Sequence, residues 1–336
     1  MYRIVGIEEI KAEAWASLVK ASGVATWFQT YEAFSFFDSI PFLTAFVFGL
    51  ESDGRLKGLV TGYLQKDGGK LKQYFSKRAV IHGGPLLSDD ISAAELSALL
   101  SACRASLKKK AIYIETRNLA DYSAYKEIFE KNGFRYEAHL DFIVDTSSEE
   151  IVEKNLYKSK RKRIRSSLKE GAVVDENPSL DDVRAFYGLL HGLYSNKVKT
   201  PLWPLSFFEA LYNKPFARFL LMKKDEVVIG GQLILIWEHN CVYLYYLCGE
   251  DGKYEGLYPS ILGTYAGLQY AAKNGCPRCD MLGAGKPGQK YGVRDFKAEF
   301  GGTLVEYGRF LAVTQPLLYR IGCLGVKILK SKWFRR

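Results

Sequence analysis

Residues 283–307, GAGKPGQKYGVRDFKAEFGGTLVEY, place Lys297 shortly after a loop rich in glycine. When an amine attacks an ester or thioester, negative charge develops on the carbonyl oxygen. A fixed cation in a poorly hydrated cleft stabilises that charge most strongly. Lys297 can supply such a cation, and the alternative is a solvated surface lysine with no chemical role.

Three other chemistries are disfavoured at the residues that suggest them. Gly283, Gly285 and Gly288 have the G-x-G-x-x-G spacing of a dinucleotide site, but Pro287 and the following glycines interrupt the helix that such a site requires. Gln289 stands where a P-loop needs lysine. The four histidines lie in no nucleophile motif, so we expect direct transfer without a covalent enzyme intermediate.

Metal binding is also not expected. Cys276 and Cys279 have C-x-x-C spacing, but no second pair of ligands follows them, and a structural zinc site needs four. We interpret this segment as a turn between a helix and a strand. The six cysteines should be reduced thiols, because the N-terminal residues have charges where a secretory signal needs an apolar stretch.

Basic residues are concentrated in two segments of a chain whose formal net charge is +10. Residues 154–169 contain eight basic residues and no acidic one, and residues 317–336 contain six with none. The first segment has helical periodicity and can bind the phosphates of tRNA, of a lipid or nucleotide diphosphate, or of CoA; a solvated helix face remains the alternative. Its candidate polyanion-binding residues are Lys158, Lys160, Arg161, Lys162, Arg163 and Arg165.

The elements that must position these residues occur twice. Each half has a β-hairpin, with turns at residues 52–54 and 224–225, followed by alternating strands and helices, and aligning the hairpins puts Gly58 opposite Gly230. A period near 170 residues indicates two similar domains. We predict an α/β (α+β) protein with domains at 1–148 and 149–316, followed by a basic amphipathic helix at 317–336.

The order of elements in each half resembles the N-acetyltransferase (GNAT) unit, and two units in one chain resemble the Fem (FemABX) peptidyltransferases. In that family a glycine-rich loop leads into a Lys-x-x-Phe-Gly core, here Lys297 to Gly301, and the lysine lies at the acyl-transfer centre. The resemblance implies two tandem GNAT-like domains with mixed β-sheets flanked by helices. It also implies that Lys297 is catalytic and that the C-terminal helix packs on the first domain.

Further site residues follow from the same resemblance. A polar turn with Lys197 and Lys199 is flanked by Tyr194 and Trp203, and it would contact a phosphate or peptide. The other candidate substrate-binding residues are Tyr254, Tyr291, Arg294, Gln29 and Tyr31. A general base is not assigned; Asp295 and Glu299 are the carboxylates nearest to Lys297 in the sequence.

These observations predict an enzyme that transfers an amino acid from aminoacyl-tRNA to an amine of a peptidoglycan precursor or similar acceptor, without a metal or resident cofactor. One alternative is a CoA-dependent N-acyltransferase acting on a cell-envelope or polysaccharide substrate. The GNAT pyrophosphate motif, [RQ]-x-x-G-x-[GA] at a helix start, is absent from residues 81–90 and 249–263. A second alternative is a non-catalytic protein that binds RNA or membrane.

The chain is expected in the cytoplasm, because no run of about 18 apolar residues can span a bilayer. Leu317, Ile321, Leu324 and Ile328 lie at helical spacing among the six basic residues of the C-terminal segment. This pattern also fits peripheral contact with an anionic membrane at its inner face.

Overall fold

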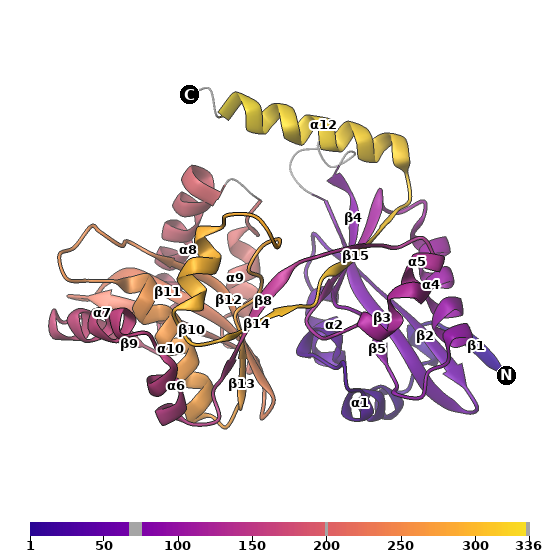
Figure 1. Cartoon of the computed structure of the whole chain (residues 1–336), viewed down its shortest axis with the longest axis horizontal. Helices are drawn as coiled ribbons and strands as arrows, with labels where there is room; N and C mark the ends of the chain where they lie inside the picture. Colours follow the sequence, from indigo (N-terminus) through magenta and orange to yellow (C-terminus); the bar gives the residue numbers. More distant parts are fainter. Residues whose placement is uncertain (67–75, 199–200, 334–336) are drawn as a thin grey trace. The chain divides into compact units, whose positions relative to one another are not determined.

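The computed structural model describes residues 1–66, 76–198 and 201–333, and the side chains up to residue 325 at the C-terminal end. The chain forms two compact units. Unit 1 contains residues 1–138 and 307–336, and unit 2 contains residues 139–306 (Figure 1). Each unit has one mixed β-sheet with helices against it, as the repeated element order predicts.

Unit 1 is built on an eight-stranded sheet of order β1-β2-β3-β4-β6-β15-β7, with β5 paired to β3. All neighbours are antiparallel except β4 and β6, which are parallel. Its strands are β1 (Tyr2–Val5), β2 (Thr44–Ser52), β3 (Arg55–Gln65), β4 (Arg78–Gly83), β5 (Leu86–Leu87), β6 (Tyr113–Asn118), β7 (Arg135–Glu137) and β15 (Arg309–Val313).

Apolar side chains from both faces of this sheet are covered by helices. Ile81, Ile114 and Phe310 pack with residues of α4 and α5, whereas Leu59 packs with Trp15 of α1. The helices of unit 1 are α1 (Ala12–Ala21), α2 (Tyr31–Asp38), α4 (Ala93–Leu107), α5 (Lys126–Lys131) and α12 (Pro316–Trp333), with short 3-10 turns η1 (Ile7–Glu9), η2 (Trp27–Gln29) and η3 (Ser123–Tyr125).

Unit 2 is built on a seven-stranded sheet of order β14-β8-β13-β12-β11-β10-β9. Here the parallel neighbours are β12 and β13. Its strands are β8 (Leu140–Asp145), β9 (Val173–Asp175), β10 (Ala217–Lys224), β11 (Val227–Trp237), β12 (Cys241–Gly249), β13 (Arg278–Asp280) and β14 (Thr303–Glu306).

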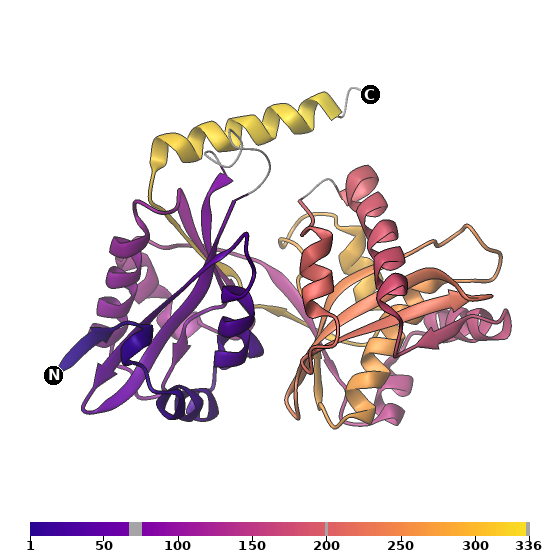
Figure 2. The same cartoon turned by 180° about the vertical axis from the view of Figure 1, so that it is seen from behind.

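Helices cover this second sheet as well (Figure 2). Leu262 and Leu268 of α10 pack in one core with Val152 of α6 and Ile164 of α7, and α8 and α9 also contact the sheet or one another. The helices of unit 2 are α6 (Glu149–Asn155), α7 (Lys158–Lys169), α8 (Leu180–Leu193), α9 (Leu205–Leu211), α10 (Pro259–Lys273) and α11 (Gly292–Ala298), with a π-helical turn η4 (Tyr194–Val198).

The two hairpins carry the same irregularity at the two aligned glycines. Gly58 pairs with Leu50 and Gly230 pairs with Met222, and in both hairpins the register shifts at the next residue of the first strand. Each shift is a β-bulge, which inserts one extra residue and increases the local twist. The alignment made from the sequence therefore identified equivalent positions.

The predicted boundaries, 1–148 and 149–316, differ from the units in the structure. Strand β8 pairs with β13 and β14 of unit 2, and β15 pairs with β6 and β7 of unit 1. Each half of the sequence thus gives its last strand to the other half's sheet. The chain passes from β14 of unit 2 to β15 of unit 1 through Gly308, whose φ of +65° is accessible mainly to glycine.

The C-terminal helix α12 begins against unit 1. The ring of Tyr319 meets that of Tyr113 edge-on, with centroids 5.5 Å apart. Leu317, Ile321 and Leu324 on the same helix are exposed. Among the described residues, no helix has the length and apolar character needed to cross a membrane. The six cysteines are free thiols, and only Cys323 is exposed.

The exchanged strand β15 should be essential to unit 1. Phe310 is fully buried and its ring stacks on Phe129 at 3.9 Å, so Phe310→Ala should lower the free energy of unfolding by about 3–5 kcal/mol. Leu304→Ala, in exposed β14, is the matched control and should change it by about 0.5 kcal/mol or less. Hydrogen exchange should show lost protection in β6 and β7; loss confined to β8 would contradict the strand assignment.

Candidate acyl-transfer site in unit 2

Lys297 lies on α11, and its side chain points toward the turn that follows β13. Its Nζ donates to three consecutive backbone carbonyls, those of Met281, Leu282 (3.1 Å) and Gly283 (2.7 Å). An ammonium has three N–H donors, so every one of them is used. Burial lowers the pKa of Lys297, and the nearby carboxyl groups of Asp141 and Asp280 act in the opposite direction.

A left-handed turn brings those three carbonyls together. Leu282 and Gly283 have φ of +53° and +79° directly after the strand ends. A leucine in this region of backbone space is uncommon and costs conformational energy. The contacts with Lys297 hold the carbonyls on one side of the turn, where otherwise they would repel one another.

Two buried aspartates hold the amides of the same turn. The Leu282 amide donates to Asp280 Oδ1 and the Gly283 amide to Asp141 Oδ1, both at 2.8 Å. Asp280 is completely buried, and its Oδ2 has no hydrogen-bond partner in the described part of the chain. Sequence reasoning missed this pair; the signal was an aspartate between apolar residues in each segment, Leu140-Asp141-Phe142 and Cys279-Asp280-Met281.

The aspartates cannot both be charged at low cost. Burial raises the pKa of Asp280 well above its ordinary value, and the neighbouring Asp141 raises it further. Burial also raises the pKa of Asp141, but the positive charge of Lys297 opposes this. We therefore assign one proton to the pair, so that one carboxylate charge balances the Lys297 ammonium.

The sheet opens beside this turn. The ladder between β12 and β13 consists of the three pairs from Cys241/Arg278 to Tyr243/Asp280, although β12 continues to Gly249. A register shift between β11 and β12 places a bulge at Tyr245. In unit 1 the equivalent parallel pair, β4 and β6, stays in register over six residue pairs. Only unit 2 therefore has strands that part early.

Aromatic residues cluster around the C-terminal half of β12, beyond its pairing with β13. The ring of Tyr246 lies 6.0 Å from that of Tyr194 and 5.2 Å from that of Phe208, and Trp203 stacks on Phe207 at 5.1 Å. The predicted residues Tyr194 and Trp203 thus join a cluster with β12 and α9. Tyr194 opens the π-helical turn η4, a geometry frequent at functional sites.

The loop after β13 connects this cluster to Lys297. Burial raises the pKa of Tyr194 to about 12, and Tyr291 raises it further. The Tyr291 ring packs against Gly285, where a Cβ would come within 2.8 Å of it. Lys197 is exposed in η4, and Lys199 lies outside the described residues.

Two predicted substrate-binding residues have structural partners instead. Arg294 donates to the carbonyls of Ala284 (2.8 Å), Gln289 (3.1 Å) and Lys286. It therefore holds the glycine-rich loop in shape and has little capacity left for a ligand. Tyr254 is half-buried against the core of unit 2, with the Lys253 ammonium 5.2 Å from its ring centre.

One residue of the basic helix α7 that was predicted to bind a polyanion, Lys160, is buried. Lys160 is only 2% exposed, and its Nζ lies 4.2 Å and 5.1 Å from the ring centres of Phe296 and Phe300. It also pairs with Glu299 at 3.7 Å. Helical spacing turns this position toward α11, so its charge serves packing and cation–π contact.

The other basic residues of α7 divide into two groups. Arg161 donates to the Glu153 carbonyl, and the Arg163 guanidinium lies 5.3 Å from the ring centre of Tyr258. The second group is a cationic stripe, which follows one helix face at intervals of three or four residues over about 16 Å. The stripe consists of exposed side chains that make no hydrogen bond or ion pair with described residues, namely Lys158, Lys162, Arg165 and Lys169.

The two candidate bases differ in their surroundings. Glu299 accepts a hydrogen bond from Ser159 Oγ at 2.9 Å and pairs with Lys160, so it joins α11 to the start of α7. Asp295 is exposed and makes no hydrogen bond or ion pair with the described residues. Of the two side chains, Asp295 is the more exposed.

In unit 1, Gln29 is a structural residue. Its side chain is fully buried, and its Nε2 donates to the carbonyls of Gly83 (3.3 Å) and Gly84 (2.8 Å) and to the hydroxyl of Tyr122 (3.1 Å). These contacts exclude the expected role in acceptor binding. Tyr31 is half exposed, with its ring edge-on to Trp15.

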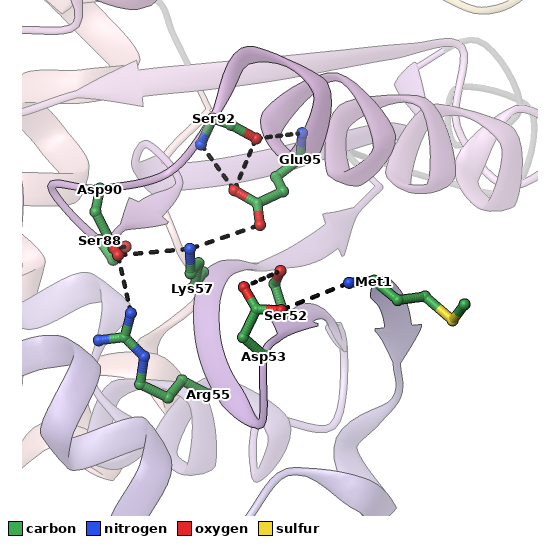
Figure 3. A network of polar contacts seen from close by, with 9 residues as sticks. All are labelled: Met1, Ser52, Asp53, Arg55, Lys57, Ser88, Asp90, Ser92 and Glu95. Atoms are coloured by element: carbon green, nitrogen blue, oxygen red, sulfur yellow. Dashed lines mark hydrogen bonds and ion pairs between the residues drawn. The ribbon is translucent and has the colours of Figure 1, made fainter.

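Carboxylates occupy the start of the long helix that follows the parallel strand in unit 1. Ser92 and Glu95 form a capping box at α4, in which Glu95 accepts from the Ser92 amide at 2.8 Å (Figure 3). Lys57 lies between Glu95 (3.7 Å) and Asp90 (3.4 Å). Hydrogen bonds from Ser52 and Ser92 hold the pKa of Glu95 at about 2, so it is charged.

The corresponding helix of unit 2 begins in a similar way. Pro259 at the first turn of α10 has no N–H, and the Ser260 amide donates to Asp251 Oδ1 at 3.2 Å. A pyrophosphate bound at a helix start needs those amides and a positive potential. Both helix starts therefore present negative charge where CoA would place its own.

The C-x-x-C segment has no ligand geometry. Cys276 and Cys279 are buried, and burial raises the pKa of both thiols. The described residues contain no group of three or more histidine, cysteine or acidic side chains arranged to hold a metal ion. Cys276 lies in the short connection between α10 and β13, and Cys279 lies in β13.

The chain resembles known proteins in one segment by sequence and over nearly its whole length by fold. Residues 212–324 match the model of the FemAB family. The structure of FemX superposes with a TM-score of 0.71 at 15% identity, covering 95% of this chain and 99% of that chain. A tandem GNAT protein from the clavulanic acid biosynthesis pathway gives 0.62 at 11% identity, with coverages of 94% and 99%.

A third similar structure is L-PGS from Bacillus licheniformis, with a TM-score of 0.57, 15% identity and coverages of 94% and 96%. No curated protein matches the chain by sequence. These likenesses confirm the expected architecture, a FemAB-like double GNAT fold with two mixed sheets flanked by helices.

The proton assigned to the aspartate pair should appear in the pH dependence of stability. A carboxyl group whose pKa is raised by folding contributes stability that is lost as pH rises above its unfolded value of about 4. Asp280→Asn keeps the acceptor for the Leu282 amide but cannot ionise. The free energy of unfolding of the variant should therefore increase relative to that of the wild type as pH rises above about 4. Urea unfolding at a series of pH values measures this difference.

Asp145→Asn provides the matched control, because hydrogen bonds from Ser147 lower the pKa of Asp145. Its stabilising contribution is present above about pH 4 and is lost as pH falls, so the wild type should lose its advantage over this variant in acid. If Asp280→Asn showed the same sign of pH dependence as Asp145→Asn, the shared proton would be wrong.

Proposed function

We propose that this FemAB-like double GNAT protein is an acyltransferase that forms an amide bond in unit 2. In the reaction, an acceptor amine attacks the carbonyl of an aminoacyl-tRNA; the new C–N bond forms, the ester C–O bond breaks, and the ribose oxygen leaves. The amine loses a proton and the ribose oxygen gains one. The observation that carries this proposal is the early parting of β12 and β13 beside the turn that Lys297 holds.

The parted strands offer a place for an acyl group. Where β13 stops at Asp280 and β12 runs on to Gly249, the edge of β12 can border an extended ligand. The aromatic side chains near this edge, among them Tyr194 and Tyr246, can exclude water from the reacting carbonyl. Unit 1 lacks this opening, since β4 and β6 remain paired.

Lys297 acts on the reaction through its charge and through the turn. Its three N–H groups are bound to carbonyls, so a direct hydrogen bond to the oxyanion requires the release of one of them. Without that release, the ammonium still favours negative charge nearby, and the single carboxylate charge of the aspartate pair keeps it protonated. Asp295 is the carboxylate that can take the amine proton.

Two features support aminoacyl-tRNA over acyl-CoA as the donor. The cationic stripe of α7 has no acidic partner among the described residues and suits a line of phosphates. The starts of α4 and α10 hold carboxylates in place of the open amides that bind the pyrophosphate of CoA in GNAT enzymes. An amine of a peptidoglycan precursor is the proposed acceptor, by likeness to the FemAB family.

Replacement of Lys297 tests the catalytic part. Lys297→Met should lower kcat for aminoacyl transfer by about 10²- to 10³-fold with little change in KM, because it removes charge that matters most in the transition state. Lys290→Met, exposed in the same loop, should retain wild-type rates. Circular dichroism checks folding, and Lys297→Arg separates charge from geometry. A wild-type rate for Lys297→Met would remove Lys297 from the mechanism.

The donor can be identified by binding. Aminoacyl-tRNA, acyl-CoA and a UDP-linked muropeptide are added separately in thermal-shift experiments, and the true ligands should raise Tm. A triple change of Lys162, Arg165 and Lys169 to Gln should weaken tRNA binding and reduce its logarithmic salt slope by about 2–3. The control triple, Lys108, Lys109 and Lys110 to Gln, changes exposed lysines of unit 1.

Each outcome of these binding experiments favours one function. An unchanged salt slope in the α7 triple variant would exclude the cationic stripe as the tRNA contact. Stabilisation by acyl-CoA alone would favour the CoA-dependent alternative. Binding of tRNA without turnover of any donor would favour a non-catalytic RNA-binding protein.

A further inference from the structure

We propose that Gln232 of β11 is a positioning residue for acyl transfer in unit 2. Its side chain holds a β-bulge in β12, and the bulge directs the rings of Tyr245 and Tyr246 to one face of the sheet. This role rests on the proposed function, because the two tyrosines lie beside the place proposed for the acyl group. Gln232 itself is 1% exposed and contacts neither donor nor acceptor.

The register of β11 and β12 defines the bulge. Leu233 pairs with Tyr246. The next residue of β11, Ile234, pairs with Leu244. Tyr245 is therefore the extra residue of β12, with no residue opposite it on β11. An extra residue interrupts the ladder of hydrogen bonds and bends the strand, so buried carbonyl groups beside it need donors from elsewhere.

The side-chain amide of Gln232 supplies these donors. Its Nε2 donates to the carbonyls of Leu233 (2.9 Å) and Tyr246 (3.0 Å), which form the residue pair on one side of the bulge. Its Oε1 is buried and makes no hydrogen bond with the described residues, which is costly for a polar atom. The reversed amide would be worse, because Oε1 would then face two carbonyl oxygens and could donate to neither.

The bulge places two neighbouring tyrosines on the same face. In a regular strand, adjacent side chains point to opposite faces. Here the ring centre of Tyr245 lies 6.4 Å from that of Phe207 on α9. The ring centre of Tyr246 lies 5.2 Å from that of Phe208 on the same helix. The two tyrosine rings also meet edge-on, with centroids 4.9 Å apart. Both therefore join the aromatic cluster with α9.

The opposite face of β12 shows the same insertion of one residue. Leu244 and Leu247 are three residues apart, a spacing that puts side chains on opposite faces of a regular strand. A Cβ on Gly267 of α10 would come within 2.6 Å of Leu244 Cδ2 and 3.5 Å of Gln232 Cγ. A Cβ on Gly263 would come within 3.3 Å of Leu247 Cδ1. Both leucines and the glutamine thus face α10.

Unit 1 provides an internal comparison. Val60, two residues after Gly58, occupies the position equivalent to Gln232. Val60 is fully buried, and its side chain has no donor. The ladder between β3 and β4 has no register shift over its three pairs, and β4 stays paired with β6. Of the two equivalent positions, the amide therefore occurs in the half whose strand is bulged and whose parallel strands part.

Gln232→Met tests the effect on the bulge without requiring turnover. Methionine has a similar size but no donor, so the two carbonyls lose their partner. In NMR spectra with labelled aromatic rings, the nuclear Overhauser effect between Tyr245 and Phe207 should be lost. Gln269→Met is the matched control and should retain it, because Gln269 is a buried glutamine of α10 whose Oε1 also has no partner among the described residues. Circular dichroism checks folding.

Steady-state kinetics test the role in acyl transfer. Misplaced rings weaken binding of the donor in the ground state and the transition state alike, so Gln232→Met should raise KM for the donor about tenfold with kcat nearly unchanged. A role in stability alone would reduce the folded fraction, which lowers the apparent kcat and leaves KM unchanged. Tyr245→Leu should raise KM similarly, and the double variant should be no worse than Tyr245→Leu, since both changes act on one interaction.

Persistence of the contact between Tyr245 and Phe207 in Gln232→Met would overturn the proposal. An equal rise of KM in Gln269→Met, or additive effects in the double variant, would also overturn it. Failure of the proposed function looks different: the wild type would turn over no donor, and the ring contact would still decide whether Gln232 holds the bulge. Gln232→Val, which copies the residue of unit 1, gives the same measurements if the methionine variant does not fold.

Discussion

The three hydrogen bonds from the Lys297 ammonium to consecutive carbonyls organise the candidate site of unit 2. They hold a left-handed turn that contains a leucine, a conformation that the backbone alone does not favour. The amides of the turn are held from the other side by Asp280 and Asp141. Removal of any of these groups leaves a buried charge or a buried dipole without its partner, and such groups are costly. The lysine, the aspartates and the turn are therefore interdependent.

The duplicated halves share one framework but differ at their parallel strands. Both hairpins keep the same bulge at Gly58 and Gly230, so the framework of the two sheets is alike. The parallel strands differ, because β4 and β6 stay paired whereas β12 and β13 part after three residue pairs. The parallel strands of unit 1 therefore form a continuous sheet. In unit 2 the strands part beside the turn of Lys297, where we propose that the acyl group binds.

Because β8 and β15 are exchanged, the folding of each half depends on the other half. Each sheet needs a strand encoded in the other half, so neither half of the sequence contains a complete sheet. Pairing strands so distant in sequence costs loop-closure entropy. Burial of apolar side chains offsets this cost, as for Phe310 against Phe129 in unit 1 and Val144 of β8 in the core of unit 2.

Hydrophobic periodicity, turn residues and the order of elements by themselves determined the double fold and the equivalence of Gly58 and Gly230, and the Lys-x-x-Phe-Gly segment made residues 283–307 the candidate site. These are local or repeated signals, carried by neighbours in the chain. Only the tertiary structure decided which sheet β8 and β15 join, because short apolar strands fit either sheet equally well. It also decided that Lys160 and Gln29 are internal, that Lys297 binds carbonyls, and that Asp141 and Asp280 form a buried pair. Each of those roles depends on burial and on partners far away in sequence, which residue types and spacing do not encode.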